Sequence, residues 1–224
     1  MNKALGADRA LALSYVPARH RPVLAALFAI DAAMGDVVRT STEPALGAIR
    51  LAWWRERLEE LDNQPPPAEP RLQAVASELT SRGIAGREVA VLANCWLRLF
   101  DPFPWGMEVA EAVWFRGRHL FALGARILAE PGEAIGAAGG LWALADATRH
   151  CSDAQSRDLL LGQARTFAGG IGGAKFPAAL RPLSMLGALA IRDAGRGEPF
   201  EREGSPARIA AMLAHRVSGR LPPL

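Results

Sequence analysis

The most regular feature of this chain is the spacing of its apolar residues, which recur at the interval typical of amphipathic helices. No stretch alternates apolar and polar residues in the manner of a β-strand. The pattern therefore predicts an all-α protein with about eight to ten helices. The expected helices cover residues 2–15, 18–39, 42–61, 72–83, 87–100, 107–128, 133–150, 155–167, 177–191 and 206–217.

Turn-forming residues separate these helices. Residues 62–67, with the sequence DNQPPP, form the plainest linker, and residues 169–173, with the sequence GGIGG, are expected to be a flexible connector. The linker at 62–67 is too short to prove a domain boundary. Because a chain of 224 residues can bury one sizeable core, we expect a single helical domain over residues 1–224, with two domains as the less favoured alternative.

The composition excludes several classes of protein. Half of the residues are hydrophobic and 22% are charged, which is too apolar for a disordered chain. The net charge of +3 is spread along the chain, and Arg116, Arg118 and His119 are expected on a solvated helix face. No basic patch is interleaved with aromatic residues, so nucleic-acid binding is not expected. No uncharged apolar run reaches the roughly 18 residues that would predict a transmembrane helix.

Two further features bear on the cellular compartment. The first residues make a poor secretory signal, because Asp8 and Arg9 interrupt the apolar segment. Cys95 and Cys151 lack metal-ligand spacing and lie in helical patterns, as expected of buried thiols in a reducing compartment. We therefore predict a cytoplasmic protein.

The stretch from residue 20 to residue 61 is the most informative part of the chain. In its first helix, Asp31 falls within an apolar stripe, while Asp36 lies on the opposite, alanine-rich side. A second stripe on the following helix combines Arg50, Trp54 and Arg57. The apolar stripe of that helix consists of Leu46, Ile49, Trp53, Leu58 and Leu61. One of the two adjacent tryptophans is expected in the core and the other at a helix edge.

The run RPVLAALFAIDAAMGDVVRTSTEPALGAIRLAWWRERLEEL, residues 21–61, resembles the N-terminal signature of the squalene/phytoene synthase family. In that family an arginine-led helix is followed by a short turn and a helix with a Trp-Trp-Arg motif, here residues 53–55. Residues 8–17 resemble the segment that usually precedes it. The turn at residues 43–44 and residues 46–51 are most similar to a divergent branch, which includes bacterial members and a mitochondrial assembly factor of respiratory complex I.

This resemblance implies an isoprenoid-synthase-like helical bundle. Active members of the family join two prenyl diphosphates head to head. Two aspartate-rich motifs hold Mg²⁺ ions that bind the diphosphate oxygens, and arginines add positive charge. Aspartates three or four residues apart lie on one helix face, so that each motif can share metal ions.

The first family motif, DDxxD, aligns with residues 35–39. Only Asp36 remains, because Gly35 and Arg39 replace the other two aspartates. Arg39 follows Asp36 by three residues and can pair with it on the helix surface, so we interpret the two as a structural pair. Asp31 lies about 140° round the helix from Asp36 and cannot replace the missing ligands.

The second motif, roughly QxxNxxRDxxxD, aligns with residues 143–154. Arg149 matches the motif arginine, but His150 and Ala154 replace the two aspartates. Asp146 stands where the family has an amide, and Asp153 is one position out of register. Oxygen-rich coordination of Mg²⁺ is hard to build from the aspartates that remain.

These substitutions define the candidate site. The candidate diphosphate-binding residues are Arg39, Arg50 and Arg149, and the relic metal-binding residues are Asp36, Asp146 and Asp153. We predict a non-catalytic family member, a pseudoenzyme without a cofactor, with a binding or assembly role toward respiratory complex I or an isoprenoid lipid. Because complex I and prenyl substrates lie in membranes, the resemblance also implies at most peripheral contact at the inner membrane. The alternative is an active prenyl diphosphate transferase with altered ligands, which would use Mg²⁺ and a prenyl diphosphate substrate. A third hypothesis is a ligand-free bundle acting through an exposed apolar helix.

Overall fold

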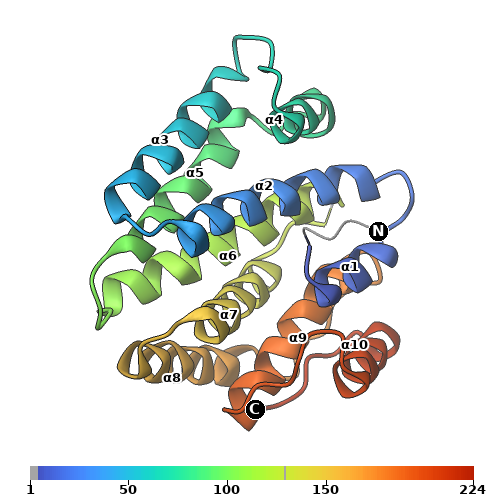
Figure 1. The fold of residues 1–224 in the computed structure, drawn as a ribbon. Coiled ribbons are helices and arrows are strands. Elements are labelled where there is room, and N and C mark those ends of the chain that lie inside the picture. Colours follow the sequence, from blue (N-terminus) through green and yellow to red (C-terminus); the bar gives the residue numbers. More distant parts are fainter. Residues whose placement is uncertain (1–4, 129) are drawn as a thin grey trace. The chain divides into compact units, whose positions relative to one another are not determined.

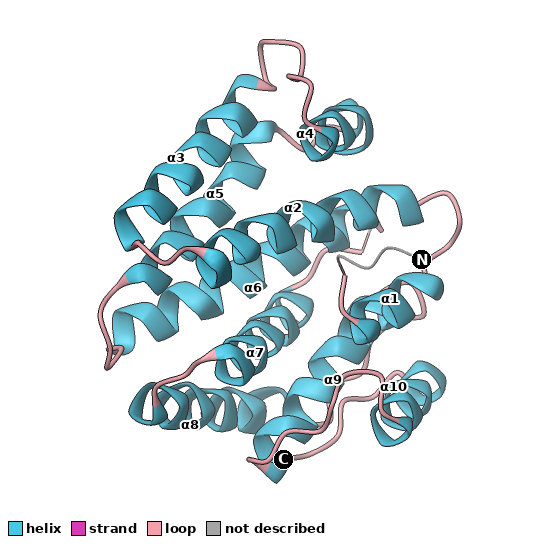
Figure 2. Ribbon diagram, in the orientation of Figure 1, coloured by secondary structure: helices cyan, strands magenta, loops and turns pink. Residues whose placement is uncertain are grey.

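The computed structural model describes residues 5–128 and 130–224, and its regular secondary structure is helical throughout these ranges (Figure 2). Ten α-helices are present in the described part of the chain, and short π and 3₁₀ turns extend two of them. The predicted all-α fold is confirmed. None of the described helices is both long enough and apolar enough to cross a bilayer. The chain divides into two compact units, residues 17–101 and a unit that combines the N-terminal segment to Val16 with residues 102–224.

The unit over residues 17–101 contains the family-like stretch. Its helices are α2 (Arg21–Thr40), α3 (Pro44–Glu60), α4 (Pro70–Ala74) and α5 (Gly86–Leu97). A π turn over Val75–Leu79 and a 3₁₀ turn over Thr80–Arg82 continue α4, and a second 3₁₀ turn, Arg98–Phe100, continues α5. The chain leaves this helical run at Gly83, whose φ of 82° favours glycine. α3 and α5 lie side by side (Figure 1).

The face that α3 buries differs from the predicted one. Leu58 is fully buried, but Leu46, Ile49 and Trp53 are 50%, 65% and 40% exposed, so the predicted apolar stripe is wrong over the first half of the helix. The buried residues of α3 are Gly47, Leu51, Trp54 and Leu58. When a helix has two apolar stripes, residue spacing identifies both of them but does not show which one is buried. The neighbouring helices determine this.

The second unit contains six helices. They are α1 (Ala7–Ser14), α6 (Met107–Ile127), α7 (Glu133–His150), α8 (Ala154–Ile171), α9 (Arg181–Arg196) and α10 (Pro206–Ser218). α7 packs against α6, α8 and α9, and twelve of its 18 residues are buried. Its apolar and small residues lie on all sides, as expected of a helix surrounded by others. α8 continues to Ile171, so the predicted connector at 169–173 is wrong over its first three residues.

Glycines allow α6 and α7 to approach closely. A Cβ added at Gly117 of α6 would overlap the carbonyl oxygen of Gly139, and a Cβ at Gly139 would overlap the carbonyl oxygen of Gly117. Gly140 is covered by the indole of Trp114. The backbones of α6 and α7 therefore meet directly at this crossing.

A buried serine–histidine hydrogen bond joins α9 to α10. The Oγ of Ser184 lies 2.7 Å from Nε2 of His215, whose Nδ1 lies 3.1 Å from the carbonyl oxygen of Arg220. Because a carbonyl only accepts, Nδ1 carries the proton, and the serine hydroxyl donates to Nε2. Burial lowers the pKa of His215, and the nearby charge of Arg181 also lowers it, while the hydrogen bond to the Arg220 carbonyl raises it. The imidazole is thus held neutral.

The lowered pKa predicts a loss of stability on acidification. Since the folded-state pKa of His215 lies below the unfolded value of about 6.5, the unfolded chain binds the proton more tightly. The free energy of unfolding should therefore fall as the pH drops below about 6.5. We expect a smaller fall for His215→Gln than for the wild type when the melting temperature is compared between about pH 7.5 and about pH 5.5. Equal pH dependence in both proteins would contradict this.

Candidate functional site

The first motif position lies on the exposed side of α2. The carboxylate of Asp36 accepts a hydrogen bond of 2.7 Å from the guanidinium of Arg39, and their side chains are 55% and 34% exposed. The predicted pair is therefore present. Such solvent-exposed pairs contribute about 0–1 kcal/mol, so this one has little effect on stability. It does place a positive charge against the single aspartate that remains of the family motif.

Asp31 is the buried carboxylate of the same helix. Its side chain is 0% exposed and accepts a hydrogen bond of 2.9 Å from the indole nitrogen of Trp96 on α5. This bond joins α2 to α5 and satisfies an oxygen whose burial would otherwise be costly. Asp31 therefore has a structural, hydrogen-bonded role.

Arg50 differs from the other two candidate arginines. It is exposed on α3, and no carboxylate lies within 4.0 Å of its guanidinium in the described part of the chain. The same helix buries the indole of Trp54, while the ring of Trp53 stands edge-on to it with a centroid separation of 5.0 Å. Trp54 is thus the core tryptophan of the pair.

The second motif lies near the C-terminal end of α7. The carboxylate of Asp146 lies 3.5 Å from the guanidinium of Arg116 on α6 and 3.7 Å from the imidazole of His150. Arg116 is only 1% exposed, so its predicted place on a solvated face is wrong. Its guanidinium also lies 5.2 Å from the ring centroid of Trp142, a cation–π distance. Protein groups thus already surround the Asp146 carboxylate.

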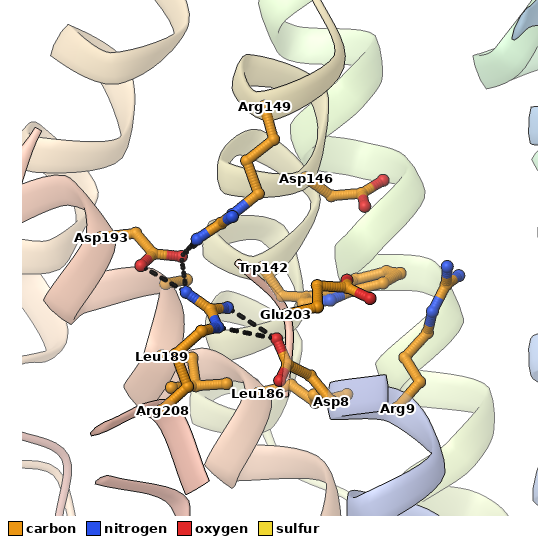
Figure 3. A pocket seen from close by; sticks show the side chains of 11 residues that line it. Asp8, Arg9, Trp142, Asp146, Arg149, Leu186, Leu189, Asp193, Glu203 and Arg208 are labelled. Atoms are coloured by element: carbon orange, nitrogen blue, oxygen red, sulfur yellow. Dashed lines mark hydrogen bonds and ion pairs between the residues drawn. The ribbon is translucent and has the colours of Figure 1, made fainter. Parts of the chain in front are cut away.

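Arg149 belongs to a chain of buried charges (Figure 3). Its guanidinium lies 2.8 Å from the carboxylate of Asp193 on α9 and donates to the carbonyl of Glu201, also at 2.8 Å. Arg208 of α10 donates to both oxygens of Asp193, at 2.6 and 2.9 Å, and lies 2.7 Å from the carboxylate of Asp8 on α1. We call Asp8, Arg208, Asp193 and Arg149 the buried charge network.

The space beside the buried charge network is very small. The cavity there has a volume of about 20 Å³, room for about one water molecule. Trp142, Asp146 and the charged side chains of Arg9 and Glu203 close its walls (Figure 3). Sites for small organic ligands have volumes of roughly 300–1,000 Å³. Side chains therefore fill this part of the unit, and Arg149 points at Asp193 instead of at an open cavity.

Asp153 caps a helix. Its carboxylate accepts hydrogen bonds from the backbone nitrogen and the hydroxyl of Ser156, at 2.8 and 2.6 Å, and so caps the N-terminus of α8. These bonds lower the pKa of Asp153, with the nearby charge of Arg157 acting in the same direction. Asp153 lies one residue away from the motif position, and its role as a helix cap explains this, because an aspartate is favoured directly before a helix.

The residues present do not fit the magnesium ions of the family. Mg²⁺ requires near-octahedral oxygen coordination, usually with carboxylates that are free to bind it. Here Asp36 is paired with Arg39, Asp146 lies beside Arg116, and Asp153 caps α8. Across residues 5–128 and 130–224, no group of three or more histidine, cysteine, aspartate or glutamate side chains could hold a metal ion.

Sequence reasoning missed three members of the buried charge network. Asp8, Asp193 and Arg208 are each 4% exposed. Asp8 lies on α1, far in the sequence from the consecutive helices α9 and α10 that carry the other two. Charged residues inside otherwise apolar helical stripes are the available signal, since burial of such groups requires partners. The signal indicates that a partner is needed but does not identify it.

Comparison with known proteins agrees with the resemblance found in the sequence. Residues 3–94 match the family model of squalene/phytoene synthase. No curated protein and no solved structure matches the chain. The matched range includes Asp36, Arg39 and Arg50, and it ends before the second motif.

Proposed function

We propose that this chain, a member of the squalene/phytoene synthase family through residues 3–94, is a non-catalytic member that acts by binding or assembly. Its partner would be an isoprenoid lipid or a component of respiratory complex I. The protein would work in the cytoplasm, with at most peripheral contact at the inner membrane, and without a cofactor.

This proposal rests on one observation: the motif residues that remain are already bound by other groups of the protein. Ionisation of a prenyl diphosphate needs concentrated positive charge at the leaving group, which the family supplies through Mg²⁺ held by aspartates. In this chain the remaining aspartates are bound by the protein's own groups, and Arg39 and Arg149 form ion pairs with Asp36 and Asp193. The loss of function at a site is compatible with retention of the fold.

We expect no diphosphate release when the purified protein is mixed with farnesyl or geranylgeranyl diphosphate and Mg²⁺. The released diphosphate is measured for the wild type and for Asp36→Ala, with an active family enzyme as the positive control. The variant is a fair comparison because its exposed ion pair contributes about 0–1 kcal/mol to stability, so that it should stay folded.

Circular dichroism establishes that both proteins are folded during the assay. Release above the Asp36→Ala level would overturn the proposal and would favour an active transferase with altered ligands. Equal background release from two folded proteins supports a non-catalytic role.

A further inference from the structure

An apolar groove runs between α9, α10 and the residues that follow α10. Its volume is about 400 Å³, within the range of small-molecule sites. Ala188 of α9, Ala211 and Ala214 of α10, and Pro222 and Pro223 form its walls. α9 and α10 pack against each other within one unit (Figure 1). The groove is about twenty times larger than the cavity beside the buried charge network.

The wall formed by the two prolines is held in place by backbone hydrogen bonds. The Leu221 nitrogen donates to the Ala174 carbonyl at 2.9 Å, and the Gly173 nitrogen donates to the Leu221 carbonyl at 3.2 Å. Arg181 donates to the carbonyls of Arg216 and Val217 at 3.1 and 3.0 Å. The groove is therefore formed before any ligand binds, which lowers the entropic cost of binding.

Two arginines line the groove, and only one of them forms an ion pair with a carboxylate among the described residues. Arg192 forms two hydrogen bonds of 2.7 Å to the carboxylate of Glu201, and these, with the nearby charge of Arg196, lower the pKa of Glu201 to about 2. Arg192 is thus neutralised by an ionised partner. Arg220 has no carboxylate within 4.0 Å in the described ranges, and its side chain makes one long hydrogen bond, 3.4 Å, to the carbonyl of Gly173.

The remaining titratable side chain that lines the groove is His215. His215 is 3% exposed, and its burial and the nearby charge of Arg181 lower its pKa, so that the neutral imidazole is favoured. The groove therefore combines an apolar wall with an uncompensated guanidinium at its rim. This combination complements a ligand with an apolar chain and an anionic end.

We propose that the groove between α9 and α10 binds a single-chain anionic amphiphile, with its carboxylate or phosphate on Arg220 and its hydrocarbon chain against the alanine and proline walls. Burial of the chain contributes the apolar part of the affinity, and the charge-assisted hydrogen bonds at Arg220 fix its direction. Binding here is independent of diphosphate chemistry. A negative result in the binding test would not change the conclusion from the diphosphate assay. Diphosphate release in that assay would likewise not show whether the groove binds an amphiphile.

Calorimetric titration of the full chain with decanoate, decyl phosphate and neutral 1-decanol tests the proposal, with the two anions kept below their micelle concentrations and the alcohol below its solubility limit. We expect saturable binding of at least one anion, and the stronger of the two identifies the headgroup. The neutral alcohol should bind about 10-fold more weakly than the preferred anion, because it lacks the charge-assisted bond. Equal affinity for the alcohol, or no saturable binding of either anion, would overturn the proposal.

Paired variants locate the site. Arg220→Gln should weaken binding of the anion about 10-fold, while Arg202→Gln, an exposed arginine that does not line the groove, should leave it unchanged. Ala214→Leu should fill the groove and also weaken binding about 10-fold, while Ala210→Leu, at an exposed position of α10 that does not line the groove, should not. Wild-type affinity in both Arg220→Gln and Ala214→Leu would place the ligand elsewhere and contradict the assignment.

Discussion

Replacement of Arg208 by methionine should lower the free energy of unfolding by about 3–5 kcal/mol. The Arg208 side chain is 5% exposed and lies between two carboxylates, those of Asp8 and Asp193, which are 5% and 4% exposed. Methionine fills a similar volume but leaves both carboxylates without their shared cation. Asp193 keeps its contact with Arg149, whereas among the described residues Asp8 keeps only the backbone nitrogen of Gly204, at 3.0 Å. Urea-induced unfolding followed by circular dichroism measures the loss.

The matched control is Arg202→Met, which removes an exposed arginine close in the sequence and should change stability by no more than about 0.5 kcal/mol. Asp8→Asn in the Arg208→Met background should recover part of the loss, because it removes the carboxylate left without compensation. A loss below about 1 kcal/mol for Arg208→Met, or no recovery in the double variant, would mean that the buried charge network contributes little.

The local part of the fold could be predicted from the sequence. Helix bounds followed from apolar spacing and from turn-forming residues, as at Gly83, where a left-handed conformation ends the helical run. The Asp36–Arg39 pair could also be predicted from the local sequence, because residues three apart on a helix are neighbours. The predicted connector at 169–173 failed over its first three residues, because a glycine costs only about 1 kcal/mol in a helix and the exposed Gly169 and Gly170 do not end α8.

The non-local part could not be predicted. Asp8 and Arg208 are 200 residues apart in the sequence and meet at 2.9 Å, a contact that no local pattern encodes. Arg116 was assigned to a solvated face from its charge, but the carboxylate of Asp146 and the ring of Trp142 make its burial tolerable. The candidate diphosphate-binding role of Arg149 likewise depended on whether a carboxylate lay nearby, and Asp193 provides one.

Gly139→Ala should destabilise the protein by about 3 kcal/mol, at the upper end of the cost of overpacking a core. The added methyl group would overlap the carbonyl oxygen of Gly117 and lie 2.5 Å from Cγ of Phe121. Backbone cannot move aside as a flexible side chain can, so α6 and α7 would have to separate along a crossing where both helices are buried. The measurement is the free energy of unfolding by urea titration.

Gly136→Ala on the same helix provides a control with the opposite expected sign. Its added methyl group would lie no closer than 3.7 Å to any neighbouring atom, an ordinary contact distance, so that only helix propensity changes. Alanine is favoured over glycine within a helix by about 0.5–1 kcal/mol, and this variant should be stabilised by that amount. Similar effects of the two substitutions would show that glycine in α7 matters through propensity alone. Opposite signs would show that the close approach of α6 and α7 depends on Gly139, because the two variants differ in what their methyl groups meet.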